Sequence, residues 1–215
     1  MKTKILSFLL PLIAFWIIGG YFLLNYSKTD IHLFFNNYHS AFGDSFFVVA
    51  NFFGEWQFVI IAILLCVVLK NYYSALLMFV AFTFNGMFVQ FLKKMVFPEY
   101  LRPKPYFEKL SSTINTKLNF VIDIDINSYN SFPSGHTTQV FTIFLVLALL
   151  SKNSFVAFVC FWLALLSGFS RIYLQQHFLG DVYAGSVIAT FLTFIFFFSF
   201  EKYLKENKKL AGKLF

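Results

Sequence analysis

Charged side chains are scarce in this sequence. Only 13% of its 215 residues are Asp, Glu, Lys or Arg, whereas 59% are hydrophobic. A soluble domain of this length carries about twice that share of charge, so the composition excludes an ordinary soluble protein. The apolar residues also occur in long runs rather than alternating with polar ones, and such runs predict transmembrane helices.

Cysteine and the common cofactor motifs are also nearly absent. Cys66 and Cys160 both lie inside apolar runs without a CxxC partner, so we interpret them as inert packing residues. The chain has no glycine-rich nucleotide loop and no HExxH motif. Asp123 and Asp125 have no third ligand within reach along the sequence, so they do not indicate a metal site. We therefore expect no metal and no other cofactor.

The apolar runs predict a single all-α domain over residues 1–215, built as a bundle of six transmembrane helices. Lys2 and Lys4 resemble the start of a signal peptide. However, the run that follows has the length of a membrane span and no small-residue cleavage site, so we expect an uncleaved first helix. The six spans are placed near residues 5–24, 47–69, 73–96, 134–150, 154–173 and 179–200.

Two stretches depart from this simple pattern. Gly54 and Glu55 interrupt the second run, so residues 45–55 are expected to form an interfacial helix that leads into a shorter span. Residues 25–44 mix polar and aromatic side chains and predict an amphipathic segment on the membrane surface, with His32 and His39 at the interface.

The lysines predict the orientation in the membrane. With six spans and both termini on one side, that side carries nine lysines against Glu201 and Glu206, which equals the net charge of +7 of the whole chain. An excess of Lys and Arg marks the cytoplasmic face, so both termini are expected there. The basic tail 201–215 is then a cytoplasmic anchor, not a nucleic-acid site. The nine are Lys2, Lys4, Lys70, Lys152, Lys202, Lys205, Lys208, Lys209 and Lys213.

A first candidate site segment, Pro133-Ser134-Gly135-His136, stands at the start of the fourth span. Ser134 is a good N-cap for the helix that follows. The start of a helix offers unpaired N–H groups and a partial positive charge, which suit a phosphate. Gly135 lets the backbone approach an oxyanion closely. The segment predicts a phosphate site with His136 beside it.

A second segment, Ser170 to Asp181, joins the fifth and sixth spans on the same predicted side. His177 and Asp181 are four residues apart, so on a helix the carboxylate can orient one imidazole nitrogen and leave the other free as a base or nucleophile. Arg171 offers a planar, permanently charged fork for phosphate oxygens. Together these side chains indicate the cleavage of a phosphate ester.

Lysines at the end of the third span add a third element. At 100° per residue from Asn85, Lys93 falls on the polar arc of the helix, and Lys94 falls at its edge. We therefore expect Lys93 to point into the bundle toward substrate, with Lys94 as the alternative. Lys104, Lys109 and Lys117 lie in the following outer loop. A solvated loop face is the favoured interpretation, and contact with a second phosphate or a sugar head group is the alternative.

These motifs resemble the three-part signature of the type 2 phosphatidic acid phosphatases. The parts are Arg102-Pro103, then Pro133-Ser134-Gly135-His136, then Ser170-Arg171 with His177 and Asp181. The second and third parts match fully, and the resemblance covers residues 45–200. The first part departs, because the family usually has six residues between its Lys and the Arg-Pro, whereas here there are eight from Lys93 or seven from Lys94.

The resemblance implies a role for each matching residue. His177 would be the nucleophile and Asp181 its orienting partner. His136 would protonate the leaving oxygen and then activate water. The phosphoryl oxygens would be held by Lys93, Arg102, Ser134, Gly135 and Arg171.

The leading hypothesis is a lipid phosphatase with its active site on the outer face of the cytoplasmic membrane. It would act on undecaprenyl diphosphate, phosphatidic acid, phosphatidylglycerol phosphate or lipid A phosphate, with membrane lipids around it and no obligate protein partner. The stretch Ser134–Lys152 would span roughly 27 Å, slightly less than the bilayer core, so His136 would lie at or just below the surface. A non-catalytic transporter or scaffold and a vanadate-binding haloperoxidase are the alternatives.

Overall fold

The computed structural model describes residues 2–111, 118–121 and 128–206, and these segments are helices and their connections, with no strand among them. The expectations for Lys117, Asp123, Asp125 and the tail from residue 207 fall outside this described part. The elements are α1 Lys2–Asn25, α2 Lys28–Asn36, α3 Ala41–Phe52, α4 Trp56–Val68, α5 Tyr72–Phe91, the π-helical turn η1 Leu92–Val96, α6 Pro103–Ser111, α7 Gly135–Leu150, α8 Ser154–Tyr173 and α9 Leu179–Glu206.

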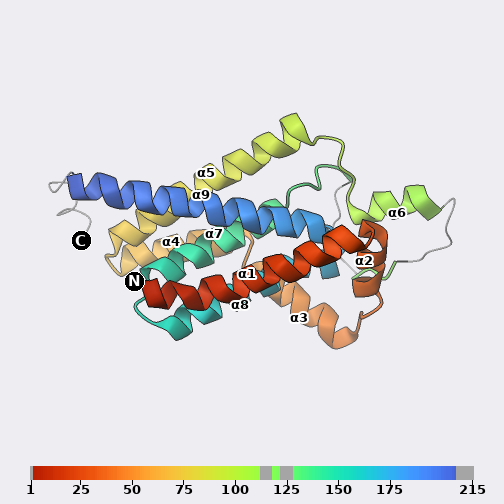
Figure 1. The fold of residues 1–215 in the computed structure, drawn as a ribbon, viewed down its shortest axis with the longest axis horizontal. Coiled ribbons are helices and arrows are strands. Elements are labelled where there is room, and N and C mark those ends of the chain that lie inside the picture. The colour runs from red at the N-terminus through yellow and green to blue at the C-terminus, as the bar shows by residue number, and fades with distance from the viewer. Residues whose placement is uncertain (1, 112–117, 122–127, 207–215) are drawn as a thin grey trace.

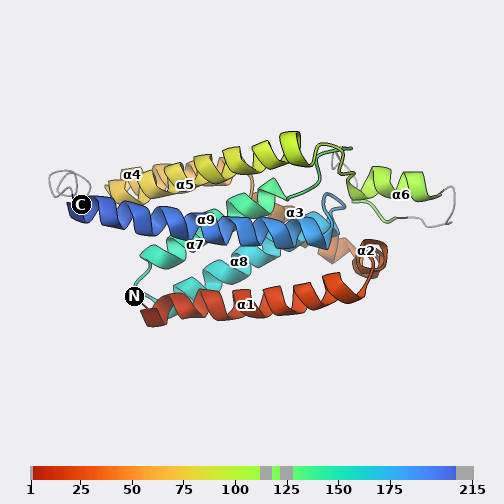
Figure 2. The same cartoon turned by 45° about the horizontal axis from the view of Figure 1, so that its top comes forward.

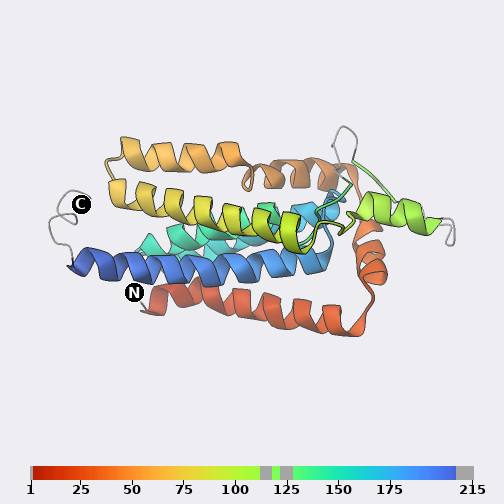
Figure 3. The ribbon, with the colours of Figure 1, turned by 90° about the horizontal axis from the view of Figure 1, so that it is seen from above.

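The long helices run side by side along one axis of the molecule (Figures 1 and 2). The start of α1 and the end of α9 lie at the same end of this bundle, whereas α2 and α6 lie at the other end (Figure 3). α7 packs against α5, α8 and α9, while α1 and α3 pack on α8. The two motif segments, at the start of α7 and between α8 and α9, therefore meet at the end remote from the termini.

Among the described residues, four helices are long and apolar enough to cross a membrane, namely α1, α5 with η1, α8 and α9. A fifth span results if α3 and α4, which are bent by 49° at a short break, count as one. This break lies between Phe52 and Trp56, where Gly54 and Glu55 are predicted to interrupt the second apolar run. α7 has only 16 residues, or about 24 Å of helix, which is shorter than the hydrocarbon core. The structure thus supports four or five of the six predicted spans by length.

α7 is enclosed by other helices along most of its length. Val140, Phe141, Ile143 and Leu145 are fully buried along its length. In a membrane, helices associate through close packing and polar contacts, because lipid tails are as apolar as the core. Asn85 of α5 provides such a contact, since its amide donates to Thr142 Oγ1 at 2.6 Å and to Thr193 Oγ1 at 3.2 Å.

The segment 25–44 folds back over the end of the bundle, so one expectation from the sequence is wrong. His32 is not interfacial but buried, and its ring hydrogen-bonds the Gln175 side chain and packs against Phe107 and Phe178. Burial lowers the pKa of His32 to about 4, so the ring stays neutral near pH 7. His39 bonds Asp44 and stacks on Tyr173.

Gly185 of α9 allows the start of α7 to pack closely against α9. A Cβ at this position would lie 2.7 Å from the Ser134 carbonyl oxygen and 3.2 Å from Thr137 Cβ. By contrast, a Cβ on Gly86 of α5 would meet no atom within 4 Å.

We therefore expect Gly185→Ala to destabilise the protein by about 1–3 kcal/mol through overpacking. Gly86→Ala is the matched control and should be neutral or stabilising by up to about 1 kcal/mol, because alanine favours helix. Thermal unfolding in detergent measures both effects. Equal midpoints for the two variants would contradict the close α7–α9 packing.

Candidate active site

His177 and Asp181 meet at the junction of α8 and α9. His177 Nδ1 lies 3.2 Å from Asp181 Oδ2. The same carboxylate oxygen accepts the Ser131 hydroxyl and the Phe178 backbone N–H, the latter at 3.0 Å. With Nδ1 facing the carboxylate, the free electron pair of the neutral ring lies on Nε2.

The pair forms in a different way from the one the spacing suggested. We expected both side chains on one helical face, but α9 begins at Leu179, so His177 lies in the preceding turn. Asp181 is in the first turn of α9, and its carboxylate reaches back to the backbone N–H of Phe178. The carboxylate thus ties the turn to the helix start while it orients the imidazole.

His177 is 2% exposed and lies in a strongly cationic setting. Burial, together with Lys93, Arg102 and Arg171, lowers the pKa of His177 well below the usual value for histidine. The ring is therefore neutral near pH 7. A neutral, oriented imidazole is the form in which histidine acts as a nucleophile.

Ser134 caps α7, as predicted. Its side chain accepts the Thr137 backbone N–H at 3.3 Å and the Thr137 hydroxyl at 2.9 Å. Its own backbone N–H donates to the Asp181 carbonyl oxygen at 3.0 Å. This bond joins the two motif segments directly and points the N-terminus of α7, with its partial positive charge, toward the junction.

The side chain of Lys93 lies at this same N-terminus. A Cβ added to Gly135 would be 3.8 Å from Lys93 Cε. Lys93 is buried, and its ammonium donates to the Asn130 carbonyl oxygen at 2.7 Å. Lys94 is exposed. These orientations are the ones that helix phase predicts, and the binding of phosphate by Lys93 stays a prediction.

The spacing anomaly before Arg102 coincides with an irregular helix. Residues Leu92–Val96 form a π-helical turn, closed by Phe97 N donating to Leu92 O at 2.8 Å. A π-turn holds one residue more than an α-turn. Part of the extra length between Lys93 and Arg102 is therefore taken up without turning Lys93 away from the bundle.

Two arginines converge on one neutral side chain. Arg102 donates to the Gln176 amide oxygen at 2.8 Å, and Arg171 donates to the same oxygen at 3.4 Å. Arg171 also donates to Asn51 Oδ1 at 2.7 Å. These hydrogen-bond acceptors carry no formal charge, although the Glu55 carboxylate lies 3.7 Å from Arg171, so much of the positive charge stays available for an anionic ligand.

His136 lies in the first turn of α7, where its ring contacts Glu55 and Ser167. Its side chain is 7% exposed, and its Nδ1 lies 3.7 Å from Glu55 Oε1. Its Nε2 lies 3.1 Å from Ser167 Oγ. The structure thus gathers all the predicted residues around the start of α7 and the α8–α9 turn.

Sequence reasoning missed four residues that support these side chains. Gln176 directly precedes His177, and Ser131 lies two residues before Pro133. A single polar residue in a loop forms no sequence pattern that would indicate a role. Asn51 and Glu55 lie in an apolar run, where a polar side chain needs a partner. The energetic cost of an unpaired polar side chain in a membrane could have indicated that Asn51 and Glu55 have partners. It could not identify those partners.

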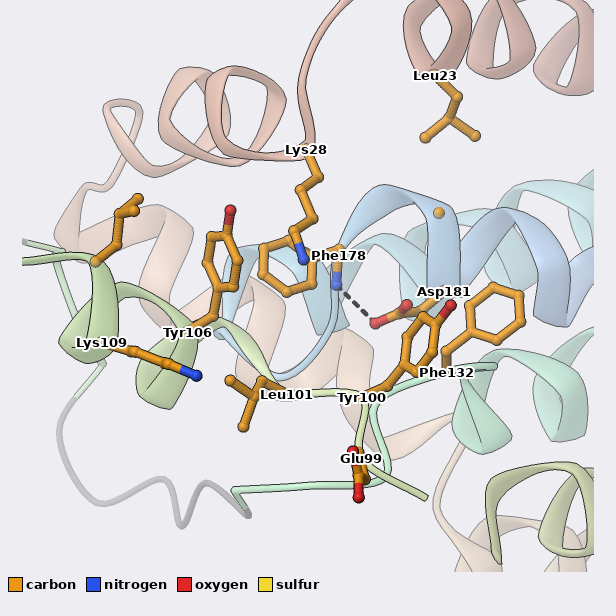
Figure 4. Close-up of a pocket in the computed structure, with 12 residues that line it drawn as sticks. Leu23, Lys28, Glu99, Tyr100, Leu101, Tyr106, Lys109, Phe132, Phe178 and Asp181 are labelled. Carbon is orange, nitrogen blue, oxygen red and sulfur yellow. Dashed lines mark hydrogen bonds between the residues drawn. The ribbon is translucent and has the colours of Figure 1, made fainter. Parts of the chain in front are cut away.

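A cavity lies on the side of Asp181 that faces α2 and α6. It measures about 730 Å³, and Figure 4 shows Lys28, Tyr106 and Phe178 along it. The Lys28 ammonium lies 3.9 Å from the centre of the Tyr106 ring. Neither histidine of the motifs lines this cavity. In the part of the chain that the structure describes, no three His, Cys, Asp or Glu side chains group as a metal site.

Residues 74–205 match the model of the PAP2 superfamily. The chain is 31% identical to undecaprenyl-diphosphatase BcrC of Bacillus subtilis over 52% of its own length, a match that spans about half (51%) of that relative. It is 29% identical to a lipid A 4'-phosphatase of Bacteroides thetaiotaomicron, over 86% of this chain and 83% of the relative.

Two solved structures share the fold. LpxE of Aquifex aeolicus gives a TM-score of 0.67 at 22% identity, covering 81% of this chain and 98% of the other. A transmembrane PAP2-type phosphatidylglycerolphosphate phosphatase from Bacillus subtilis gives 0.65 at 22% identity, covering 93% and 96%.

A multi-pass membrane phosphatase is the class that these matches and the helical fold define. The chain belongs to the PAP2 superfamily, since the family model covers more than half of it. Its similar proteins are lipid phosphatases, and the chain is a hydrolase of that kind.

Lys93 and Lys94 provide a sharp test of the site. Neutralising a lysine that stabilises transition-state charge costs typically a few kcal/mol, whereas an exposed lysine at a membrane border loses little. We expect Lys93→Met to lower turnover by about a hundredfold or more, and Lys94→Met by less than about fivefold. Phosphate release from a lipid phosphate measures both variants. The reverse ranking would show that Lys94 is the functional lysine.

Proposed function

We propose that the protein hydrolyses a lipid phosphate or diphosphate through a phosphohistidine intermediate. The observation that carries the proposal is the convergence of an oriented, neutral His177 with Lys93, Arg102 and Arg171 at the start of α7. Phosphoryl transfer requires little more than in-line positioning and stabilisation of the charge on the phosphoryl oxygens.

In the first step, His177 Nε2 forms a bond to phosphorus while the bond from phosphorus to the lipid oxygen breaks. That oxygen takes a proton from His136. In the second step, a water molecule gives a proton to His136 and attacks phosphorus, so the P–N bond breaks and phosphate is released. Lys93, Arg102, Arg171 and the N–H groups at the start of α7 hold the phosphoryl oxygens in both steps.

We further propose that α7 is a sixth, short span and that the site faces the outside of the cytoplasmic membrane. The lysine distribution supports this orientation, because the lysine-rich end of the bundle is the one that carries both termini. A short α7 supports a site slightly below the membrane surface, where a head group can enter while its tails stay in lipid.

The substrate class follows from the same placement. The similar proteins are named for undecaprenyl diphosphate, lipid A and phosphatidylglycerol phosphate. All of these ligands combine a phosphate at the interface with tails in the membrane. We propose a ligand of this chemistry, and a panel of purified lipid phosphates, each assayed for released phosphate, identifies the preferred one.

His177→Ala should lower phosphate release by about three orders of magnitude or more, because no other group replaces the nucleophile. His39→Ala is the matched control, since His39 lies outside the site, and it should stay within about threefold of wild type. Gel filtration in detergent checks that both variants fold. Substantial phosphatase activity in folded His177→Ala protein would refute the mechanism, and a scaffold function would survive the substitution.

Activity should persist in excess EDTA, because the three cationic side chains and the helix N-terminus neutralise the phosphoryl oxygens. Vanadate should inhibit, since it adopts the five-coordinate geometry of the transition state. Both are measured as phosphate release with purified protein. Complete loss on chelation that magnesium restores would contradict the proposed site.

A further inference from the structure

The break between α3 and α4 brings a third segment to the active site, outside the motifs. Asn51 lies in the last turn of α3, and Glu55 immediately precedes α4. Both side chains face the two motif segments, which are more than 75 residues away along the chain. The two helices are bent by 49° at this break, and the residues of the break contact the motif residues His136 and Arg171.

Glu55 lies between an acid and a phosphate-binding residue of the proposed mechanism. Its Oε1 is 3.7 Å from His136 Nδ1 and 3.7 Å from an Arg171 nitrogen. Asn51 holds it there, since its amide donates to Glu55 Oε1 at 2.9 Å while its own oxygen accepts from Arg171 at 2.7 Å. Asn51, Glu55 and Arg171 thus contact one another, and His136 joins them through Glu55.

Gly54 fixes the imidazole from a second direction. A Cβ on Gly54 would overlap His136 Nε2 and its two neighbouring ring carbons, so the ring packs directly on the Gly54 backbone. Ser167 of α8 meets Nε2 on the same side. The Gly54 backbone and the Glu55 carboxylate, both in the α3–α4 break, therefore restrict the orientation of the His136 ring.

The charges at this position explain why a carboxylate is required. A general acid must carry a proton before the leaving oxygen departs. The His136 side chain is buried, and the charged or titratable groups facing it are Arg171, His177 and Glu55. Burial, Arg171 and His177 all oppose a positive charge on the ring, and the Glu55 carboxylate at 3.7 Å offsets only part of this cost. Glu55 is the one carboxylate within 4 Å of His136 among the described residues.

We propose that Glu55, held by Asn51, is a positioning residue that orients His136 through its Nδ1 and offsets part of the cost of the protonated ring when His136 acts as the acid. The proposal rests on the proposed function and adds to it a residue that no motif contains. Glu55 acts through His136 and does not touch the phosphoryl group. The competing role, a counter-ion for Arg171 alone, would affect the binding of every phosphate equally.

The leaving group separates these two roles. A poor leaving group, such as the alkoxide of phosphatidic acid, needs the proton from His136, whereas p-nitrophenolate departs without one. We expect Glu55→Gln to lower kcat/KM for phosphatidic acid by about tenfold or more, and for p-nitrophenyl phosphate by less than about threefold. His136→Ala should show the same selectivity, and Glu55→Asp should restore part of the activity toward phosphatidic acid. Glu201→Gln, at the far end of the bundle, is the matched control and should match wild type with both substrates.

A double variant completes the test. If Glu55 acts through His136, Glu55→Gln should have no further effect in a His136→Ala background. Gly54→Ala should reproduce the leaving-group selectivity, because it displaces the His136 ring while the carboxylate remains. Equal losses with both substrates, or losses that multiply in the double variant, would overturn the proposal. A wild-type protein inactive toward all lipid phosphates would instead refute the proposed function.

Discussion

Asp181 joins the two halves of the active site through its backbone and its side chain at once. Its carbonyl oxygen accepts the Ser134 backbone N–H at the start of α7. Its carboxylate binds His177, Ser131 and the Phe178 N–H. The phosphate-binding helix start and the nucleophile are therefore fixed relative to each other by one residue, and every other contact of the site is built around that geometry.

The cationic side chains are held mainly by neutral acceptors. Lys93 bonds a backbone carbonyl, and the two arginines share the amide oxygen of Gln176. Neutral acceptors satisfy the donors, whose loss would be costly in a buried site, but they do not cancel the charge. The Glu55 carboxylate, 3.7 Å from Arg171, is the exception, and carboxylates hydrogen-bonded to every cation would have weakened their attraction for phosphate further. The arrangement keeps the positive charge available while fixing where it lies.

Much of this architecture could be predicted from the sequence, because its signals are local. The apolar runs locate the spans, the N-cap serine locates the start of α7, and helix phase alone separates Lys93 from Lys94. Contacts between distant segments could not be predicted in the same way. The burial of His32 depends on how α2 folds over the bundle, and the contacts of Glu55 depend on the direction of the bend after α3. The spacing of His177 and Asp181 indicated the pair but not the turn that forms it, because the carboxylate bonds a backbone N–H just before the helix.

The neutral acceptors around Arg102 and Arg171 also affect how a catalytic cycle ends. The positive charge that attracts a phosphorylated lipid also attracts inorganic phosphate, because both present phosphate oxygens to the same guanidinium groups. The dephosphorylated lipid has no such attachment and can return to the bilayer at once. Under the proposed mechanism we therefore expect the release of inorganic phosphate to be slower than the departure of the lipid, and free phosphate to inhibit turnover.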